Sequence, residues 1–303
     1  DFIGDILQSP DEQSQTLALS MNLEQKSLNL SDGDYTFRVY STGKTFKGIQ
    51  ALDLSIKYAP ISKYIAAAAK EPRGLMGMTL YFPEPSGKYY IPISRFVPYS
   101  RVPIRTTIDN LREGSDATLG FECPVPEIKK LQVRRDMVIV HLPANLGEYN
   151  ENALKGTNAV DSFVHSLTSL PGVNRVKFLL DGKESDRIFY NHSTSTIFEQ
   201  DINPKIYLGM DRNQKRLLLV PCPFAVSDSS KLVEEMFSAI KTAKIQENFS
   251  AELIAPIPDE VSLINFSQND NILLLNFNEA FLNAHIDRLD LQRFMLDSIL
   301  YSF

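Results

Sequence analysis

Residues 78–94, MTLYFPEPSGKYYIPIS, place two short apolar segments on either side of a turn rich in Pro and Gly. This pattern predicts a β-hairpin with strands at 78–82 and 89–94. A second hairpin pattern follows further along the chain, where KIYL (205–208) and RLLLVP (216–221) flank a turn at 211–213. The chain therefore contains this hairpin twice.

The elements after each hairpin also recur in the same order. In the first copy we expect a helix closed by Gly114, a hairpin of 130–133 with 137–142, a helix over 158–170 and a strand at 173–182. In the second copy we expect a helix with Leu232, Met236 and Ile240 on one face, a hairpin of 262–266 with 272–277, and a helix from about 290 to 301. The markers Pro124-Val125-Pro126 and Pro256-Ile257-Pro258 precede the two later hairpins. Agreement over so many elements indicates an internal duplication.

The duplication predicts an α+β fold of tandem β-β-α-β-β-α-β modules, each a small mixed sheet with helices packed on one face. The expected organisation is an N-terminal linker or strand-rich segment at 1–74, a first module at 75–202 and a second module at 203–303. The second copy reaches Phe303 without a counterpart of the strand at 173–182. We expect that strand to be missing or to be supplied by another segment, such as residues 1–74.

The front segment carries weaker signals. Residues 35–40 alternate as a half-buried strand would, and the alanine-rich residues 61–70 favour a helix that ends before Glu71-Pro72-Arg73-Gly74. Residues 41–45, STGKT, resemble the tail of a phosphate-binding loop, but position 38 is Arg38 where that loop needs Gly. A tight turn between strands is the better interpretation.

Composition excludes several classes of protein. The 303 residues include 31 Lys and Arg against 37 Asp and Glu, for a net charge of −6. Such a balance gives no electrostatic case for binding nucleic acid. No apolar run approaches the ~18 residues that a membrane-spanning helix needs.

The sequence shows no catalytic constellation, cofactor motif or metal site. Histidines 141, 165, 192 and 285 are scattered, and no G-x-S-x-G or C-x-x-C motif occurs. Cys123 and Cys222 are interpreted as isolated thiols, with a disulfide between them left open for an extracytoplasmic chain. The acidic pairs Glu234-Glu235 and Asp287/Asp290 are expected on solvated helix faces rather than in a cleft. We therefore expect a non-enzymatic protein without cofactors.

Aromatic and arginine residues gather near the first hairpin, a composition that protein interfaces favour. About half of the aromatic side chains are expected to fill the core. Residues 96–99, past the second strand in a loop marked by proline, are the best candidates for exposure. The candidate interaction surface is therefore Arg95, Phe96, Tyr99 and Arg101.

Three stretches of the first copy resemble the GerMN domain family: LYFP at 80–83, YIPISR at 90–95, and the closing SLTSLPGVNRVKFLLDG at 166–182. The resemblance covers about 75–185 well and 203–303 more loosely. The second copy departs from this resemblance with Pro221-Cys222-Pro223 in place of Ile93-Ser94-Arg95, and it has no counterpart of the closing segment at 166–182.

The resemblance implies a sporulation or spore-germination protein outside the cytoplasm, membrane-anchored through a lipid upstream of Asp1, in the space between mother cell and forespore. It implies a scaffold or assembly factor of an envelope-spanning complex, with protein partners or self-association, no nucleic acid, and no membrane contact except the anchor. No catalytic residue is carried over from the family. Because GerMN units also occur joined to amidase domains, the alternative is a peptidoglycan-associated enzyme or glycan-binding subunit.

Overall fold

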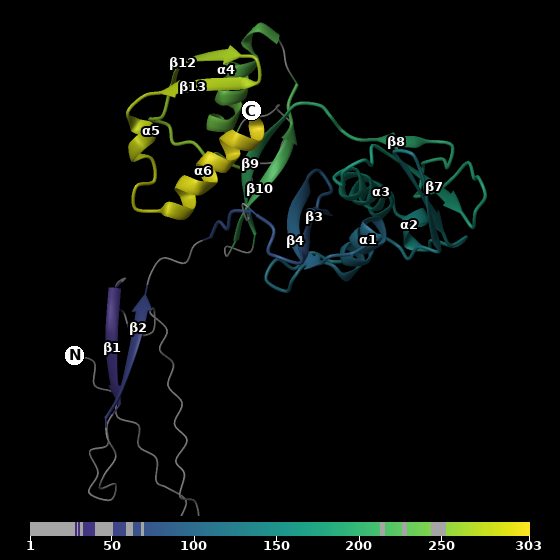
Figure 1. The fold of residues 1–303 in the computed structure, drawn as a ribbon, viewed down its shortest axis with the longest axis horizontal. Helices are drawn as coiled ribbons and strands as arrows, with labels where there is room; N and C mark the ends of the chain where they lie inside the picture. The colour runs from purple at the N-terminus through teal and green to yellow at the C-terminus, as the bar shows by residue number, and fades with distance from the viewer. Residues whose placement is uncertain are drawn as a thin grey trace, which may run out of the picture. The chain divides into compact units, whose positions relative to one another are not determined.

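The structure is a computed structural model that describes residues 28, 30, 33–39, 51–58, 63–67, 70–212, 216–225, 229–243 and 253–303 (Figure 1). The chain divides into two compact units, residues 1–62 and 63–303. The second unit holds both copies of the predicted module. The stretches at 16–21 and 41–45 lie outside the described residues.

The first unit contains one antiparallel hairpin, formed by β1 (Gly33–Val39) and β2 (Leu52–Tyr58). This confirms the strand expected near 35–40. Tyr35 and Phe37 lie opposite Ile56 and Leu54 in the register, so one face of the hairpin is apolar. On the other face, Arg38 binds both carboxylate oxygens of Asp53 at 2.7 and 2.8 Å.

Residues 75–199 form the first module, in the predicted order of elements. Its elements are β3 (Leu75–Pro83), β4 (Tyr90–Pro98), α1 (Pro103–Glu113), β5 (Lys130–Arg134), β6 (Met137–Leu142), α2 (Glu148–Glu151), α3 (Ala153–Thr168), β7 (Arg175–Leu180) and β8 (Ile197–Glu199). Helix α3 begins earlier than its apolar stripe predicts, because the Asn152 side chain accepts a hydrogen bond from the Lys155 N–H at 3.0 Å and caps the helix.

The second module repeats this order from residue 205 as far as the helix that corresponds to α3, with one additional short strand, β11. Its elements are β9 (Lys205–Arg212), β10 (Arg216–Pro223), the 3₁₀ turn η1 (Ser229–Lys231), α4 (Leu232–Thr242), β11 (Leu253–Ile254), β12 (Leu263–Asn269), β13 (Ile272–Phe277), α5 (Ala280–Asn283) and α6 (Leu289–Ser302). The α+β class and the duplicated order of elements are confirmed.

Hydrogen bonding divides the strands of each module between two sheets rather than one. In the first module β3 and β4 form one sheet, and β5-β6-β7-β8 form another, in which β6 and β7 are parallel and joined through α3. In the second module the sheets are β10-β9-β11 and β12-β13. In the second module the outer edge of β9 also pairs with the short strand β11, at Met210 and Gly209.

Helix α1 shows how local sequence sets an element. Pro103 occupies its first turn, where the missing N–H costs nothing, and Ile108 and Leu111 are fully buried on one face. The helix ends at Gly114, whose φ of 83° suits glycine, and a Cβ there would lie 2.9 Å from the carbonyl oxygen of Phe121.

In both modules a serine hydroxyl on a helix accepts a hydrogen bond from the outer edge of the first strand. The Tyr81 N–H in β3 donates to Ser166 Oγ of α3 at 2.9 Å, and the Tyr207 N–H in β9 donates to Ser302 Oγ of α6 at 2.9 Å. Each tyrosine lies opposite a proline in the paired strand, Pro92 or Pro221. Helices α3 and α6 therefore provide a hydrogen-bond acceptor for a strand N–H that no other strand of the described residues pairs with at this point.

Residues 63–67 are not helical, contrary to the expectation for 61–70. Tyr64 instead forms a parallel bridge with Leu217 of β10, and the Leu217 N–H donates to the Lys63 carbonyl at 3.0 Å. The Tyr64 ring packs edge-on against Phe294 at 5.3 Å between centroids, and its hydroxyl donates to Asp297 at 2.8 Å. Tertiary burial of one large side chain outweighs the weak helix propensity of a short alanine-rich segment.

The front segment thus contacts the second module, but not where the missing strand was expected. The counterpart of β7 would lie beside β13, whereas residues 63–64 lie beside β10. The position beside β13 stays unpaired by any strand of the described residues. Residues 63–67 therefore do not take the place of the missing strand, because Tyr64 is buried between β10 and α6. For the rest of residues 1–74 the replacement stays a prediction.

Within the described residues, no helix combines the length and hydropathy needed to cross a membrane. The domain limits 75–202 and 203–303 remain a proposal. The buried side chains of the two modules belong to one continuous hydrophobic cluster, and β4 packs beside β10.

We predict that Tyr64→Ala lowers the free energy of unfolding by about 3–5 kcal/mol, because it removes a buried aromatic side chain. Tyr64→Phe should cost about 1.5–3 kcal/mol, since it leaves the buried Asp297 carboxylate without one of its donors. Urea unfolding of the whole chain measures both. Tyr99→Ala, at a side chain 75% exposed, is the matched control and should change stability little. Equal stability of the Tyr64 variants and the wild type would contradict this packing.

Candidate functional site

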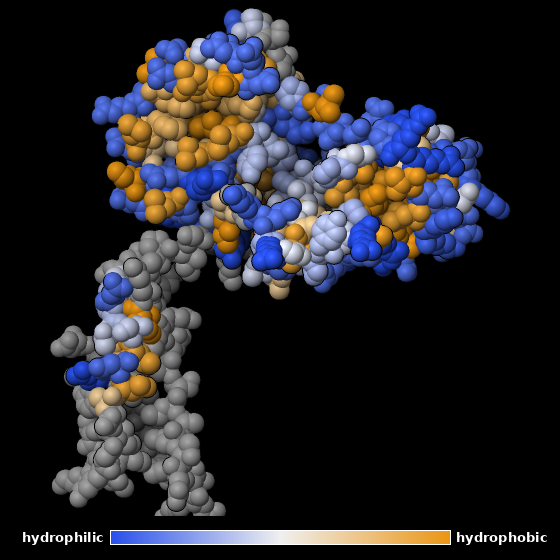
Figure 2. Space-filling model, viewed as in Figure 1, coloured by the Kyte–Doolittle hydropathy of each residue, from blue (hydrophilic) through white to orange (hydrophobic). Residues whose placement is uncertain are grey.

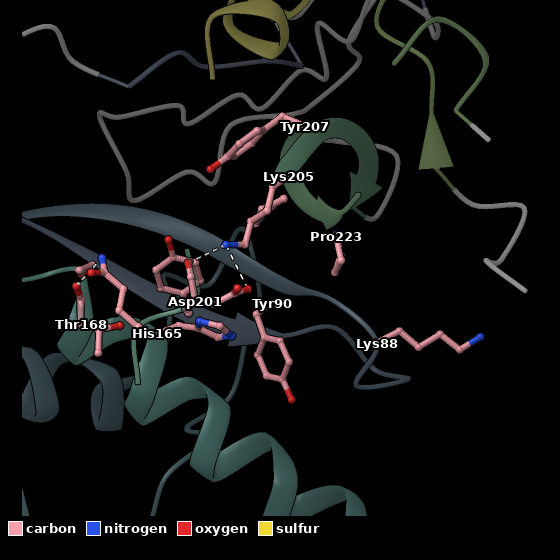
Figure 3. A pocket seen from close by; sticks show the side chains of 12 residues that line it. Lys88, Tyr90, His165, Thr168, Asp201, Lys205, Tyr207 and Pro223 are labelled. Carbon is pink, nitrogen blue, oxygen red and sulfur yellow. Dashed lines mark hydrogen bonds and ion pairs between the residues drawn. The ribbon is translucent and has the colours of Figure 1, made fainter. Parts of the chain in front are cut away.

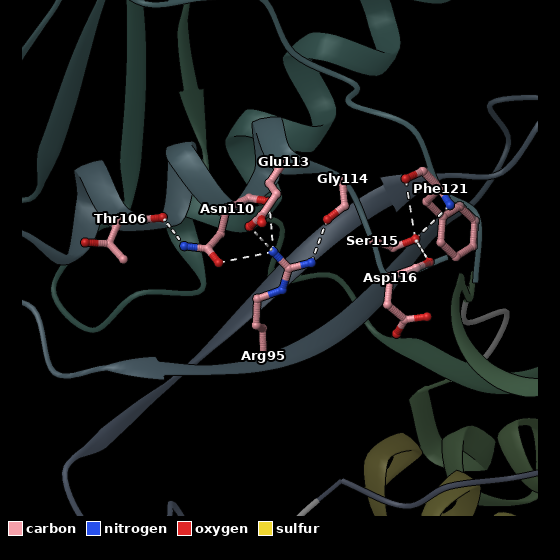
Figure 4. Close-up of polar contacts among 8 residues, drawn as sticks. All are labelled: Arg95, Thr106, Asn110, Glu113, Gly114, Ser115, Asp116 and Phe121. Carbon is pink, nitrogen blue, oxygen red and sulfur yellow. Dashed lines mark hydrogen bonds and ion pairs between the residues drawn. The ribbon is translucent and has the colours of Figure 1, made fainter. Parts of the chain in front are cut away.

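Arg95, the first residue of the predicted interaction surface, is held by contacts within its own module (Figure 4). Its guanidinium donates to Asn110 Oδ1 at 3.1 Å, to Glu113 Oε2 at 3.0 Å and to the Gly114 carbonyl at 2.6 Å. These acceptors lie at the C-terminal end of α1, where a cation also meets the negative end of the helix dipole. Arg95 thus fastens α1 to β4.

The other three residues of the predicted surface differ in exposure. Strand β4 extends to Pro98, so Phe96 lies in the strand opposite Gly77 and is half-buried, rather than in a loop past the strand. The strand is longer than expected because β3 already begins at Leu75 and pairs with it along its whole length. Tyr99 is 75% exposed and Arg101 is exposed. Only Tyr99 and Arg101 of the four are free to meet a partner without loss of an internal contact.

A cavity of about 140 Å³ lies at the junction of the two modules (Figure 3). The first module contributes side chains from β3, β4 and α3, and the second contributes β9, β10 and the segment that leads into β9. The lining residues are Tyr81, Lys88, Tyr90, His165, Thr168, Ser169, Gln200, Asp201, Lys205, Tyr207, Pro221 and Pro223. Tyr81 and its repeat counterpart Tyr207 both face this cavity.

The connection between the modules is fixed by hydrogen bonds at one side of the cavity. Lys205 Nζ lies 3.1 Å from Asp201 Oδ2 and donates to the Asp201 carbonyl at 2.9 Å. Asn203 donates through its backbone N–H and its side chain to Asp201 Oδ1 at 3.1 and 2.7 Å. Gln200 Nε2 donates to the Thr168 carbonyl at 3.2 Å and so ties this connection to α3.

The aromatic side of the cavity is uncharged near neutral pH. His165 packs between Tyr81 and Tyr90, with ring centroids 5.3 and 5.5 Å away, and burial lowers the pKa of its imidazole. Burial also raises the pKa of Tyr81 to about 12 and raises the pKa of Tyr90 and Tyr207. The rings therefore offer apolar faces with neutral hydrogen-bonding groups.

This arrangement suits binding better than acid–base catalysis. Asp201 is the one carboxylate among the lining residues, and Lys205 and Asn203 already hold it. Glycoside hydrolysis needs a second carboxylate across the cleft. Within the described residues, no three His, Cys, Asp or Glu side chains come together as a metal site requires.

One predicted solvated carboxylate is in fact nearly buried. Asp290, at the start of α6, has a side chain 6% exposed, binds Arg288 at 2.9 Å and accepts the Lys63 N–H at 3.0 Å. The hydrogen bond from Arg288 lowers its pKa to about 2. The prediction of a solvated face was wrong for Asp290, because Arg288 and the Lys63 N–H enclose its carboxylate, whereas Asp287 and Glu234 are exposed.

Both cysteines are free thiols. Cys222 in β10 is buried, which raises its pKa to about 12, and Cys123 is exposed. A buried thiol with so high a pKa is a poor nucleophile at neutral pH.

Reasoning from the sequence did not identify the junction cavity. Its residues come from two modules and from the connection at 200–205, where no motif marks them. The usable signal was the repeat itself, because Tyr81 and Tyr207 occupy the same place in the two copies.

We predict that Arg95→Ala lowers the free energy of unfolding by about 1–3 kcal/mol, because it leaves the end of α1 without its donors. Arg95→Lys should recover only part of this loss, since one ammonium cannot span three acceptors. Arg101→Ala is the control and should unfold at the same urea concentration as the wild type. If Arg95→Ala and Arg101→Ala proved equally stable, Arg95 would not fasten α1.

Comparison with known proteins gives a match in the first module. The sequence profile of the Germane family, described as sporulation and spore germination, matches residues 79–186. No curated protein sequence matches the chain significantly.

Among solved structures, the chain is similar to the tandem GerMN domains of the sporulation protein GerM from Bacillus subtilis, at 14% identity and a TM-score of 0.48, over 69% of this chain and 81% of that chain. The first GerMN domain of the same protein matches at 17% identity and a TM-score of 0.30, over 40% and 99%. A putative lipoprotein from Clostridium perfringens matches at 15% identity and a TM-score of 0.29, over 44% and 93%. With the profile match on the described α+β module, residues 79–186 belong to the Germane, or GerMN-type, family of sporulation and spore-germination domains.

Proposed function

We propose that this chain is a non-enzymatic, extracytoplasmic sporulation or germination protein that serves as a scaffold or assembly factor for an envelope-spanning complex between mother cell and forespore. The observation that carries the proposal is the Germane domain at 79–186, followed by a second module of the same element order on a shared core. Two copies joined in this way present two related sets of surfaces.

These surfaces favour association with proteins. Tyr99 and Arg101 are exposed beside the first hairpin, and large apolar side chains are exposed on the second module, among them Leu274, Leu282 and Leu289 at 65%, 75% and 78%. Exposed apolar surface is costly for a protein that stays alone. Arg95 and Phe96 belong to the same proposed surface, and they support it from within the module. Arg95 binds the C-terminal end of α1, and Phe96 lies half-buried in β4.

The proposed location is outside the cytoplasm, at a membrane to which an N-terminal lipid anchors the protein. The Clostridium perfringens relative is described as a putative lipoprotein, and GerM of Bacillus subtilis is a sporulation protein. The proposed partners are proteins of the sporulation envelope complex, with self-association as one form. The net charge of −6 does not favour binding to nucleic acid.

We predict that deletion of the gene in an endospore-forming host lowers the count of heat-resistant spores at least tenfold and leaves vegetative growth unchanged. A fluorescent fusion should gather at the forespore envelope. Complementation with the wild-type gene is the control. Normal sporulation of the deletion strain, or cleavage of peptidoglycan by the purified chain in a muropeptide digest, would contradict the proposal.

Glycan binding is a second candidate, favoured by the junction cavity. Three tyrosine rings line it, together with Lys88 and Gln200 as polar groups. Aromatic walls with a few polar groups are typical of small-molecule sites. This function would make the chain a peptidoglycan-associated subunit without catalysis of its own.

We predict, for this second candidate, that soluble muropeptides bind the purified chain and that Tyr90→Ala or Tyr207→Ala weakens binding at least tenfold. Calorimetry measures the affinity, and thermal unfolding confirms that each variant is folded. Tyr99→Ala, outside the cavity, is the matched control. Equal affinity of the cavity variants and the control would exclude this site.

A further inference from the structure

Strand β13 has one open edge. It pairs with β12 on one side, and among the described residues no strand pairs with it on the other. Its sequence, ILLLNF at 272–277, has no charge and no proline. Charge, proline or a covering element usually protects such an edge from other chains. The first two protections are absent from β13.

The first module shows what occupies the equivalent edge. Strand β6 corresponds to β13, and each follows a tight turn with a non-glycine residue at positive φ, Arg135 at 56° or Asp270 at 50°. Strand β6 is paired on both sides, with β5 antiparallel and with β7 parallel. The open edge of β13 is therefore the place that β7 takes in the first module.

The exposure of equivalent residues shows how much less β13 is covered than β6. Ile139 of β6 is 4% exposed, whereas Leu274, in the same place in β13, is 65% exposed. On the other face Val140 is fully buried and its counterpart Leu275 is only half-buried. Figure 2 shows apolar residues gathered on this part of the second module, and Ile264, Ile272 and Leu274 are the exposed ones from β12 and β13.

The chemistry of β7 explains how it covers both faces of β6. Val176 and Phe178 point into the core, where the Phe178 ring lies 5.6 Å from that of Phe163 on α3. Lys177 lies beside Ile139 in the register and is 20% exposed, so its aliphatic stem covers that side chain. Arg175 reaches Asp136 in the turn at 2.6 Å. A strand that alternates apolar and basic residues therefore fits this edge.

The charge of the second module suits such a strand. Residues 253–303 contain seven Asp and Glu against two Arg, a net charge of −5. Both arginines are already in ion pairs, Arg288 with Asp290 and Arg293 with Asp297. Asp270 lies in the β12–β13 turn at the position of Arg135, one residue before the position of Asp136, which binds Arg175 in the first module. The net negative charge of residues 253–303, with Asp270 in the turn that leads into β13, would attract basic side chains on an incoming strand.

We propose that the outer edge of β13 binds an extended segment of a partner protein, which adds to the β12–β13 hairpin as a parallel strand and alternates apolar with basic residues as β7 does. Strand addition of this kind draws affinity from main-chain hydrogen bonds and specificity from alternate side chains. The inference deepens the proposed function by naming a docking edge and the chemistry of its partner.

The probe is a labelled peptide with the sequence of residues 173–182, VNRVKFLLDG, added to the full chain. We expect saturable binding by fluorescence anisotropy, and slower amide hydrogen exchange in residues 272–277. The amides of β6 are the internal control and should not change, because β7 already pairs with them.

Matched variants separate the edge from nonspecific adhesion. A peptide with V176S and F178S should bind at least tenfold more weakly, and so should one with R175E and K177E. In the protein, Leu274→Lys should weaken binding at least tenfold. Val133→Lys, at a side chain 56% exposed on β5, is the control and should bind as the wild type does.

A variant chain that carries a copy of residues 170–182 after Phe303 tests the β13 edge with a covalently attached strand. The added strand should protect residues 272–277 from exchange and abolish binding of the peptide. No protection of 272–277 by the peptide, or equal binding by the Leu274→Lys variant, would overturn the proposal. Concentration-dependent dimers with β13 protected in the absence of peptide would also overturn it in favour of a second copy. Peptide binding combined with normal sporulation of the deletion strain would contradict the proposed function alone.

Discussion

The architecture depends on the hydrogen bond that each module makes between the outer edge of its first strand and a helix. Tyr81 and Tyr207 present backbone N–H groups away from their partner strands, and serines of α3 and α6 accept them. A buried N–H without a partner costs about 1–3 kcal/mol, so the helix must lie close to the strand. Gly209 in β9 permits that approach, because a Cβ there would come within 2.6 Å of the Phe294 ring. These hydrogen bonds hold α3 against β3 and α6 against β9.

Once the helices are fixed, the two first hairpins meet at a junction rather than in one sheet. Pro221 and Pro223 lie in β10, which packs beside β4, and proline has no N–H to extend a ladder. The modules therefore join through side chains, and the cavity lined by Tyr81, Tyr90 and Tyr207 remains between them. Within the connection at 200–205, Asp201 binds both Lys205 and Asn203.

The two copies differ most in their second sheet, the one that contains β6 in the first module and β13 in the second. In the first module β7 and β8 complete the second sheet, and the core residues of β6 are fully buried. In the second module the corresponding strand, β13, lies at a sheet edge among the described residues and exposes Ile272 and Leu274. The same duplication thus gives one module whose second sheet is completed by its own strands and one that presents a strand edge. This difference between the two copies is the physical basis for the docking edge that we propose on β13.

Periodicity predicted most elements of the two modules. Alternating and 3.6-residue patterns placed the hairpin at 130–142 and the helices around Ile108 and Met236, because these signals are local. The extension of β4 to Pro98 was missed, since pairing with a longer β3 sets it. The predicted surface at Arg95 included a side chain that serves α1, because no local pattern records which acceptors surround a guanidinium.

By itself, the sequence determined the α+β class and the duplicated order of elements. Tertiary structure decided that Tyr64 is buried against β10 and α6, that Asp290 is covered, and that residues from both modules line one cavity. The reason is that element type follows from neighbours along the chain, whereas burial follows from contacts between residues more than 200 positions apart, such as Tyr64 with Asp297.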